Sequence, residues 1–321
     1  MEVYMKKTLL LALVLLLVVS GMGLFAAGQT ESAEGKMRVA VSLPPANNAW
    51  QARLLDTVLA ETAKDTDEFE FTVKNAVDDA DQYNMLQTFK DGGYDMIIVL
   101  PGNGTLMTPI CEEIYDAGIK VMVLDRPIES SKYTVLLAGD NYGAGVNGAK
   151  YLGARLGGKG QIAVLRSYVG IPIDLERYNG FMNTLKKEYP GIKVLVEGDG
   201  EFNQEAGLKA MSNILPAYPK IDAVFCQDDE TAIGALTAIE SAKRTDIQFV
   251  TGMGGAKNAY DRMTAKDPRY GASMSYFPSM GGDGVRLAKE ILRGATFKKD
   301  NLSPSYIVTS ENVAQYMKEA Y

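Results

Sequence analysis

From residue 38 onward, the chain alternates short apolar runs with segments of helical periodicity. Trp50–Lys64 places Leu and Val at helical spacing, and similar spacing recurs in Tyr142–Leu156, Thr231–Ser241 and Ser279–Leu292. Strands that alternate with helices predict parallel sheets covered by helices on both faces. The apolar runs that we expect to form strands are Arg38–Leu43, Phe69–Asn75, Met96–Leu100, Val121–Leu124, Thr134–Ala138, Gln161–Leu165, Lys193–Glu197, Ala223–Cys226, Gln248–Thr251 and Gly271–Tyr276.

These strands are too many for one compact sheet of ordinary size. The pattern therefore predicts an α/β fold with two doubly wound, Rossmann-like lobes, and its midpoint falls near Gly139-Asp140-Asn141. No low-complexity segment separates the halves, so we expect short crossovers between the lobes instead of a flexible tether. Near the end of the chain, Glu311–Ala320 is expected to form a closing helix.

The first residues have the pattern of an export signal. Lys6-Lys7 precede an almost wholly apolar run, Thr8 to Val19, and small residues follow up to Ala26-Ala27. The run is shorter than the roughly 20 residues that a membrane-spanning helix needs. We expect residues 1–27 to be a cleavable signal peptide. No Cys lies near the cleavage zone, which argues against a lipid anchor.

Composition excludes several classes of function. The net charge is −7 and no basic run exceeds two residues, so the electrostatic footprint of a nucleic-acid-binding protein is missing. The chain contains no His, which removes imidazole metal ligands and every Ser-His or Cys-His nucleophile. We expect no metal and no cofactor. Cys111 and Cys226 lie in segments patterned as buried, which favours core thiols over a disulfide.

One predicted strand is followed directly by two charged residues. In Val121-Met-Val-Leu-Asp-Arg-Pro127, an apolar run is followed by Asp125 and Arg126. In open α/β sheets, ligands bind at the carboxyl ends of the strands. Adjacent carboxylate and guanidinium groups hold vicinal hydroxyls by charge-assisted hydrogen bonds. The alternative is a local ion pair that closes a turn before Pro127.

Other polar or aromatic groups also stand where strands end. They are Pro45–Trp50, Glu176–Phe181, Glu201-Phe202-Asn203, Cys226-Gln227-Asp228-Asp229-Glu230 and Ser275-Tyr276-Phe277-Pro278. Each alone is explained by a helix cap, a surface pair or the core. Together they favour one shared cleft. The Gly252–Gly255 turn fits neither a phosphate-binding loop nor a dinucleotide fingerprint, because its glycine spacing is wrong and no Gly-Lys-Ser/Thr follows.

The chain resembles the ribose-type periplasmic sugar-binding proteins. The resemblance rests on Val39–Trp50, Val123-Leu-Asp125-Arg126, Arg177–Phe181 and Ala223–Leu236, in this order and with compatible spacing. It implies a type I periplasmic binding fold, in which three hinge crossings join the lobes. They would fall near Gly139-Asp140, Ser275-Tyr276 and Ser303. The lobes would then be residues 37–139 plus 276–302 and residues 140–275 plus 303–321.

The resemblance also implies roles for individual residues. Asn48 matches an amide that reaches a sugar hydroxyl, and Trp50 and Phe202 match aromatics that cover the two faces of the sugar. The matches to hydroxyl-binding charged residues are Asp125, Arg126 and Arg177. Three positions depart from the ribose binders: Asp228 replaces an Asn, Gly254 an Asp, and Tyr276 a Gln. Losing a partner in a site built for a hydroxyl costs roughly 4 kcal/mol or more, so ribose is a poor candidate.

These inferences point to an exported, monomeric substrate-binding protein. It would enclose a neutral monosaccharide or polyol and deliver it to the permease subunits of an ABC importer in the periplasm. One alternative is a sensor that presents its ligand to a chemoreceptor or a sensor kinase. Another is a glycosidase that uses Asp125 and Asp228 as its carboxylate pair. Replacing Arg177 by Ala is expected to weaken binding at least tenfold and to leave the stability of the ligand-free protein nearly intact.

Overall fold

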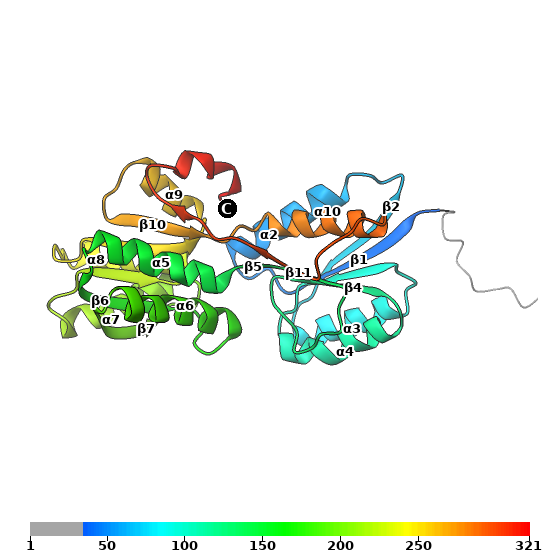
Figure 1. Ribbon diagram of the computed structural model, residues 1–321, viewed down its shortest axis with the longest axis horizontal. Helices are drawn as coiled ribbons and strands as arrows, with labels where there is room; N and C mark the ends of the chain where they lie inside the picture. Colours follow the sequence, from blue (N-terminus) through cyan, green and yellow to red (C-terminus); the bar gives the residue numbers. More distant parts are fainter. Residues whose placement is uncertain (1–34) are drawn as a thin grey trace, which may run out of the picture. The chain divides into compact units, whose positions relative to one another are not determined.

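The computed structural model describes residues 35–321 (Figure 1), so the expected signal peptide lies outside the described residues. The strands are β1 Met37–Leu43, β2 Phe69–Asn75, β3 Met96–Val99, β4 Lys120–Leu124, β5 Val135–Gly139, β6 Lys159–Arg166, β7 Gly191–Asp199, β8 Ala223–Cys226, β9 Phe249–Gly254, β10 Tyr270–Ser275, β11 Asp300–Ser303 and β12 Ile307–Val308. The α-helices are α2 Ala49–Thr62, α3 Asp79–Lys90, α4 Gly104–Asp116, α5 Asn141–Arg155, α6 Pro172–Glu188, α7 Gln204–Ala217, α8 Asp229–Ser241, α9 Lys257–Thr264 and α10 Met280–Leu292. Within residues 35–321, no helix is long and apolar enough to cross a membrane.

The strands of residues 35–321 form two six-stranded sheets. The first has the order β11-β5-β4-β3-β1-β2, and the second has the order β12-β10-β9-β8-β6-β7. Every pairing is parallel except that of β12 with β10. In Figure 1, α2 and α10 lie side by side on one face of the first sheet, and α3 and α4 cover the other face. This arrangement confirms the predicted α/β class with two doubly wound lobes.

The described part of the chain passes between the two sheets at three places. It leaves β5 for α5, which packs on the second sheet, and it returns after β10 to α10, which packs against α2. The third passage runs from β11, paired with β5, to β12, paired with β10. These passages put residues Gly139 to Asn141, Ser275 to Met280 and Ser303 to Ile307 between the sheets.

The central strands are apolar because helices cover both of their faces. All residues of β3 and of β8 are buried. Cys111 and Cys226 are free and buried, which confirms that they are core thiols.

Two features of the end of the chain differ from expectation. The predicted helix Glu311–Ala320 is wrong: two short 3-10 helices, η1 Val313–Gln315 and η2 Met317–Glu319, stand in its place. Their tighter turns let Val313, Tyr316 and Tyr321 all pack on one apolar cluster of the second lobe. The sequence analysis also missed β11, because Asp300–Ser303 has no apolar run and owes its strand conformation to pairing with β5.

Candidate functional site

Predicted site residues stand at the carboxyl ends of strands in both sheets. Asp125 follows β4, Asp228 comes two residues after β8, Gly254 ends β9 and Tyr276 follows β10. Because parallel strands end at the same edge, each sheet gathers its polar groups on one side, where α/β folds bind ligands.

Asp125 has a left-handed backbone conformation, with φ +63°. A three-residue turn closes around it, since the N–H of Arg126 donates to the carbonyl of Leu124 at 2.7 Å. Three other non-glycine residues with positive φ, Asp65, Lys243 and Lys266, follow helix ends, where this conformation is common. Asp125 follows a strand, and such strain persists mainly where it serves a function.

The Asp125 carboxylate is almost fully buried, at 2% exposed, and only one of its oxygens is closely bound. Oδ1 accepts a hydrogen bond from the Tyr276 hydroxyl at 2.5 Å, whereas Oδ2 lies 3.7 Å from Nε of Arg126. The Arg126 guanidinium instead donates from Nη1 to the carbonyl of Gly102 at 2.9 Å. The local ion pair given as the alternative in the sequence analysis is therefore present as well, although it is long and Arg126 also binds the Gly102 carbonyl.

Tyr276 contacts residues of the first lobe and lies in one of the crossings between the sheets. Its carbonyl accepts a 2.8 Å hydrogen bond from Nε1 of Trp50, and the two rings lie 5.8 Å apart. A Cβ on Gly139 would come within 2.1 Å of the Tyr276 ring, so that crossing requires glycine. Burial, together with the Asp125 charge, raises the pKa of Tyr276 well above its ordinary value. The phenol therefore stays protonated and donates to Asp125.

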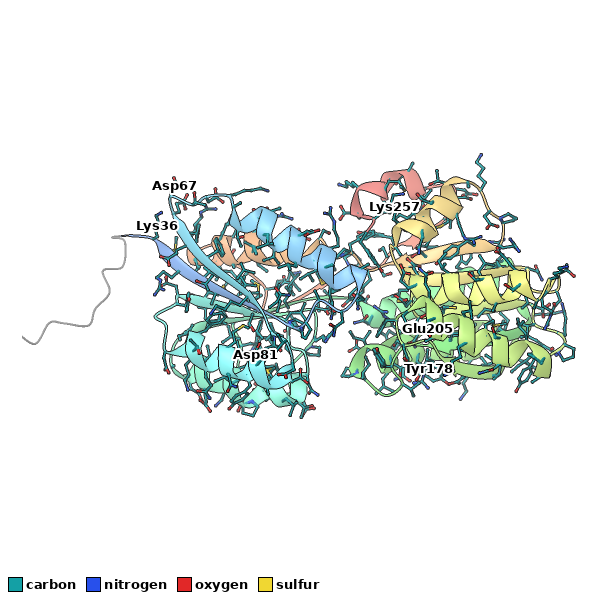
Figure 2. The ribbon with its side chains drawn as sticks, turned by 180° about the vertical axis from the view of Figure 1, so that it is seen from behind. Lys36, Asp67, Asp81, Tyr178, Glu205 and Lys257 are labelled. Atoms are coloured by element: carbon teal, nitrogen blue, oxygen red, sulfur yellow. The ribbon has the colours of Figure 1, made fainter. Side chains whose placement is uncertain are left out.

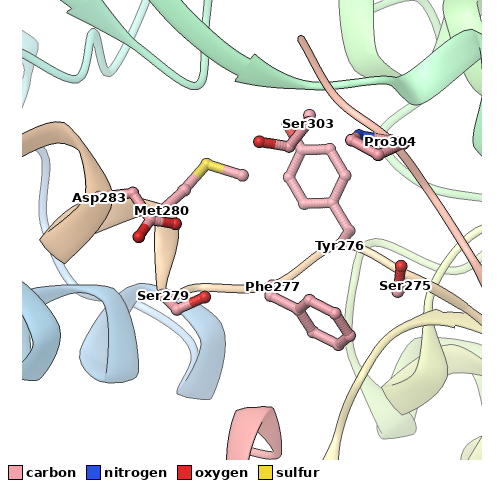
Figure 3. Close-up of a pocket in the computed structure, with 9 residues that line it drawn as sticks. Ser275, Tyr276, Phe277, Ser279, Met280, Asp283, Ser303 and Pro304 are labelled. Atoms are coloured by element: carbon pink, nitrogen blue, oxygen red, sulfur yellow. The ribbon is translucent and has the colours of Figure 1, made fainter. Parts of the chain in front are cut away.

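A pocket of about 60 Å³ adjoins Tyr276 and is lined by residues of all three crossings (Figure 3). Gly139, Ser275, Ser303 and Pro304 contribute to it, and Met280 and Asp283 come from α10. Tyr276 is the one predicted site residue in its lining. The pocket is thus a feature of the crossings, separate from Asp125, Arg177 and Asp228.

Arg177 on α6 binds its neighbours in the second-lobe part of the candidate site. It is buried, its Nε donates to Oδ1 of Asn141 at 3.0 Å, and its Nη1 donates to the carbonyl of Gln227 at 2.7 Å. The guanidinium lies 4.9 Å from the centre of the Tyr276 ring. Helices α5 and α6 approach closely here, since a Cβ on Gly145 would lie 2.1 Å from the carbonyl oxygen of Arg177. This close packing places Arg177 beside Asn141.

Asp228 is the N-cap of α8, and its Oδ1 accepts the N–H of Thr231 at 3.0 Å. Burial raises the pKa of Asp228 to about 7, the Asp229 charge adds to this effect, and Arg177 opposes it. The neighbouring Asp229 is fully buried and accepts hydrogen bonds from the backbone N–H groups of Gly255 and Ala256. Asp229 therefore fixes the turn that follows Gly254.

The structure does not pair the two predicted stacking aromatics. Among the ring contacts of residues 35–321, Trp50 lies against Tyr276, and Phe202 lies 5.7 Å from Tyr168. Phe202 is also 5.8 Å from the Arg177 guanidinium and has φ +55°, an unusual value for a bulky residue. Asn48 is exposed and caps α2, because its side chain accepts the N–H of Gln51. The sugar sandwich between Trp50 and Phe202 stays a prediction.

The sequence analysis assigned no role to two buried amides that bind residues of the candidate site. Gln227 is fully buried, and its Oε1 accepts from both the N–H and the hydroxyl of Ser167 at 2.9 Å. Asn141 begins α5 and binds Arg177. Asn141 stood at the predicted midpoint and Gln227 beside Asp228, so their positions at element ends were the available signal. Within residues 35–321, no cluster of three or more Cys, Asp or Glu could hold a metal ion.

The contacts of Arg177 change what its replacement should do. We expect Arg177→Lys to lose about 1–2 kcal/mol of unfolding free energy, because one ammonium cannot reach both Asn141 and the Gln227 carbonyl. Ligand affinity should fall at least tenfold, as measured by titration calorimetry. Arg244 is a matched control, since it also bridges a side chain, Asp246, and a carbonyl, that of Leu215. Arg244→Lys should lose similar stability and bind normally; equal affinity of the two variants would remove Arg177 from the site.

Two doubly wound lobes, three crossings between them and polar groups at the strand ends define a two-lobed α/β binding protein. The chain belongs to the periplasmic binding protein family, because the family model described as a periplasmic binding protein domain matches residues 39–296. Members of this family bind substrates, so the expectation that the chain is not an enzyme is confirmed.

Individual relatives agree with this assignment. The ribose import binding protein of Bacillus subtilis is 29% identical over 235 residues, which are 73% of this chain and 75% of that protein. An ABC transporter solute-binding protein of Bacillus halodurans, solved with bound myo-inositol, has a TM-score of 0.81 at 24% identity and covers 89% of this chain and 98% of its own. The fructose-binding periplasmic domain of a hybrid two-component system has a TM-score of 0.78 at 29% identity, over 88% of this chain and 93% of its own. The resemblance to ribose-type periplasmic sugar-binding proteins is thus confirmed.

Proposed function

We propose that this protein is the exported substrate-binding component of an ABC importer, and that it binds a neutral monosaccharide or polyol. The observation that carries the proposal is the connected set of Asp125, Tyr276 and Arg177. Tyr276 donates to Asp125 and lies under the Arg177 guanidinium, so groups from both lobes converge on one place. A ligand that touches both lobes favours the closed arrangement of the two, which a permease can recognise.

The remaining hydrogen-bonding capacity suits hydroxyl groups. Oδ2 of Asp125 lies 3.7 Å from Nε of Arg126 and accepts no close hydrogen bond, and within the described part of the chain no hydrogen bond uses Nη2 of Arg177. A carboxylate and a guanidinium together bind a hydroxyl as both donor and acceptor. The Asp125 carboxylate opposes an anion, so a neutral ligand fits better.

The departures at Gly254, Tyr276 and Asp228 support a ligand other than ribose. The Tyr276 hydroxyl is engaged with Asp125, and Gly254 offers no side chain to a ligand. Relatives differ in what they bind, since one curated relative is a xylitol-binding protein. The hydroxyl pattern that fits this site is therefore set by its own side chains.

The proposal includes the organisation of the molecule. Residues 1–27 act as a signal peptide, and the mature protein works in the periplasm as a monomer. One lobe comprises residues 37–139 plus 276–302, and the other comprises residues 140–275 plus 303–321. The sensor alternative is not favoured, because the ribose-binding relatives are import proteins.

Titration calorimetry tests the proposal with D-ribose, D-xylose, D-allose, D-fructose, D-galactose, xylitol and myo-inositol. Trp50 is the only tryptophan of the chain and contacts Tyr276, so its fluorescence gives a second signal. We expect at least one ligand other than ribose to bind with micromolar or tighter affinity and to change this fluorescence. Folded protein that binds none of the seven would contradict the proposal.

A further inference from the structure

The space beside Gly254 is occupied by the last residue described, Tyr321. A Cβ built on Gly254 would lie 2.5 Å from the Tyr321 hydroxyl oxygen and 3.7 Å from Oδ2 of Asp229. Gly254 has φ +129°, a conformation that other residues rarely adopt. The phenol thus stands where a side chain at position 254 would otherwise point.

Tyr321 is fixed in this place by its backbone. Its N–H donates to the carbonyl of Gly255 at 3.4 Å, and its carbonyl accepts from the N–H of Lys257 at 2.8 Å. Its ring packs on the apolar cluster of the second lobe. Figure 2 shows Lys257 labelled beside the final segment of the chain, drawn in red. Two bonds to the turn after β9 and one packed ring leave the phenol little freedom to move away.

The Tyr321 hydroxyl lies among the second-lobe site charges. Burial raises its pKa well above the ordinary value, the carboxylates of Asp228, Asp229 and Glu230 act in the same direction, and Arg177 opposes them. The phenol therefore keeps its proton at neutral pH and both donates and accepts hydrogen bonds. Among the side-chain hydrogen bonds of residues 35–321, those of the neighbouring Asp229 go to Gly255, Ala256, Tyr270 and Ser273 and none uses the Tyr321 hydroxyl, and Tyr321 is half-buried.

We infer that Tyr321 is a ligand-binding residue, whose hydroxyl binds a hydroxyl of the sugar or polyol in place of a side chain at Gly254. This inference rests on the proposed function and deepens it. A carboxylate at this position would only accept hydrogen bonds and would carry charge. A neutral phenol also donates a hydrogen bond, so it can bind a ligand that presents a hydrogen-bond acceptor at this position. Tyr321 is thereby a determinant of which ligand the site takes.

The test compares Tyr321→Phe with the wild-type protein, using the member of the seven-ligand panel that binds tightest. We expect at least tenfold weaker binding by calorimetry and an unchanged melting temperature of the ligand-free protein, because only the hydroxyl is lost. Singly deoxygenated forms of the same ligand locate the contact. The analogue that lacks the partner hydroxyl should bind the variant and the wild-type protein equally.

Tyr316→Phe is the matched control. Tyr316 lies in the same segment, is half-buried like Tyr321 and stacks on Phe277 with ring centres 5.8 Å apart. Its variant should bind like the wild-type protein. Tyr321→Phe binding within twofold of wild type would overturn the inference while the proposed function stands. An equal loss for every analogue, with a lowered melting temperature, would make Tyr321 structural and also overturn the inference. Failure of the wild-type protein to bind any panel member overturns the proposed function and the inference with it.

Discussion

Asp125→Asn is expected to weaken binding of the tightest panel ligand by about 100-fold, which corresponds to about 2.7 kcal/mol. Hydrogen bonds to a charged group contribute more than neutral ones, and we assign Oδ2 of Asp125, which only the long contact with Arg126 engages, as the acceptor of a ligand hydroxyl. The amide of Asn presents a donor or a weaker acceptor at that place. Asn also tolerates the left-handed backbone and its Oδ1 still accepts from Tyr276. We therefore expect loss of affinity without loss of the fold.

Asp65→Asn supplies the control for this result. Asp65 is also a carboxylate at positive φ, +57°, and it pairs with Lys289 away from the strand ends that carry the site. The same chemical change there should leave affinity within twofold of wild type. Calorimetry gives the affinities, and thermal unfolding shows that both variants are folded. If Asp125→Asn bound as tightly as Asp65→Asn, the Asp125 carboxylate would be a turn-forming group and the site would lie elsewhere.

The sequence predicts best the elements whose own residues decide their structure. β3 and β8 are apolar throughout because both of their faces are covered, so composition alone identifies them. β11 is a strand only because β5 pairs with it, and no pattern within Asp300–Ser303 records that partner. The 3-10 turns near residue 315 depend on packing against the second lobe, which local helical spacing does not reveal.

The candidate site likewise contains some features that the local sequence predicts and others that depend on residues distant in the chain. The strand-end position of Asp125 and Asp228 follows from the alternation of strands and helices, and the sequence shows it directly. The partner of Arg177 does not follow in this way, because Asn141 lies 36 residues away and reaches it only through the close packing of α5 and α6. Tyr321 meets Gly254 across 67 residues, a contact that only the path of the final segment creates.

Asp228→Asn is expected to raise the free energy of unfolding at pH 8 by up to about 4 kcal/mol, which is the pKa shift of Asp228 converted to energy. Burial moves the pKa of Asp228 from 3.8 to about 7, so the native protein keeps this proton up to about pH 7 while the unfolded chain loses it near pH 4. Between these values the native state binds more protons than the unfolded state. The free energy of unfolding therefore falls as the pH rises from 4 to 7, and above pH 7 the whole cost of a buried carboxylate is present. Asn avoids this cost and caps α8 equally well.

The pH dependence separates this cause from any general effect of the substitution. Chemical denaturation at pH 4, 5, 6, 7 and 8 should show nearly equal stability of wild type and variant at pH 4, with a difference that grows up to pH 7. Asp78→Asn is the control, because Asp78 caps α3 through the N–H of Asp81 and is exposed. The free energy of unfolding of Asp78→Asn should differ from that of the wild-type protein by the same amount at every pH. A difference between Asp228→Asn and wild type that stayed constant from pH 4 to pH 8 would mean that the Asp228 carboxyl is hydrated or paired in the native protein, and that its burial carries no charge penalty.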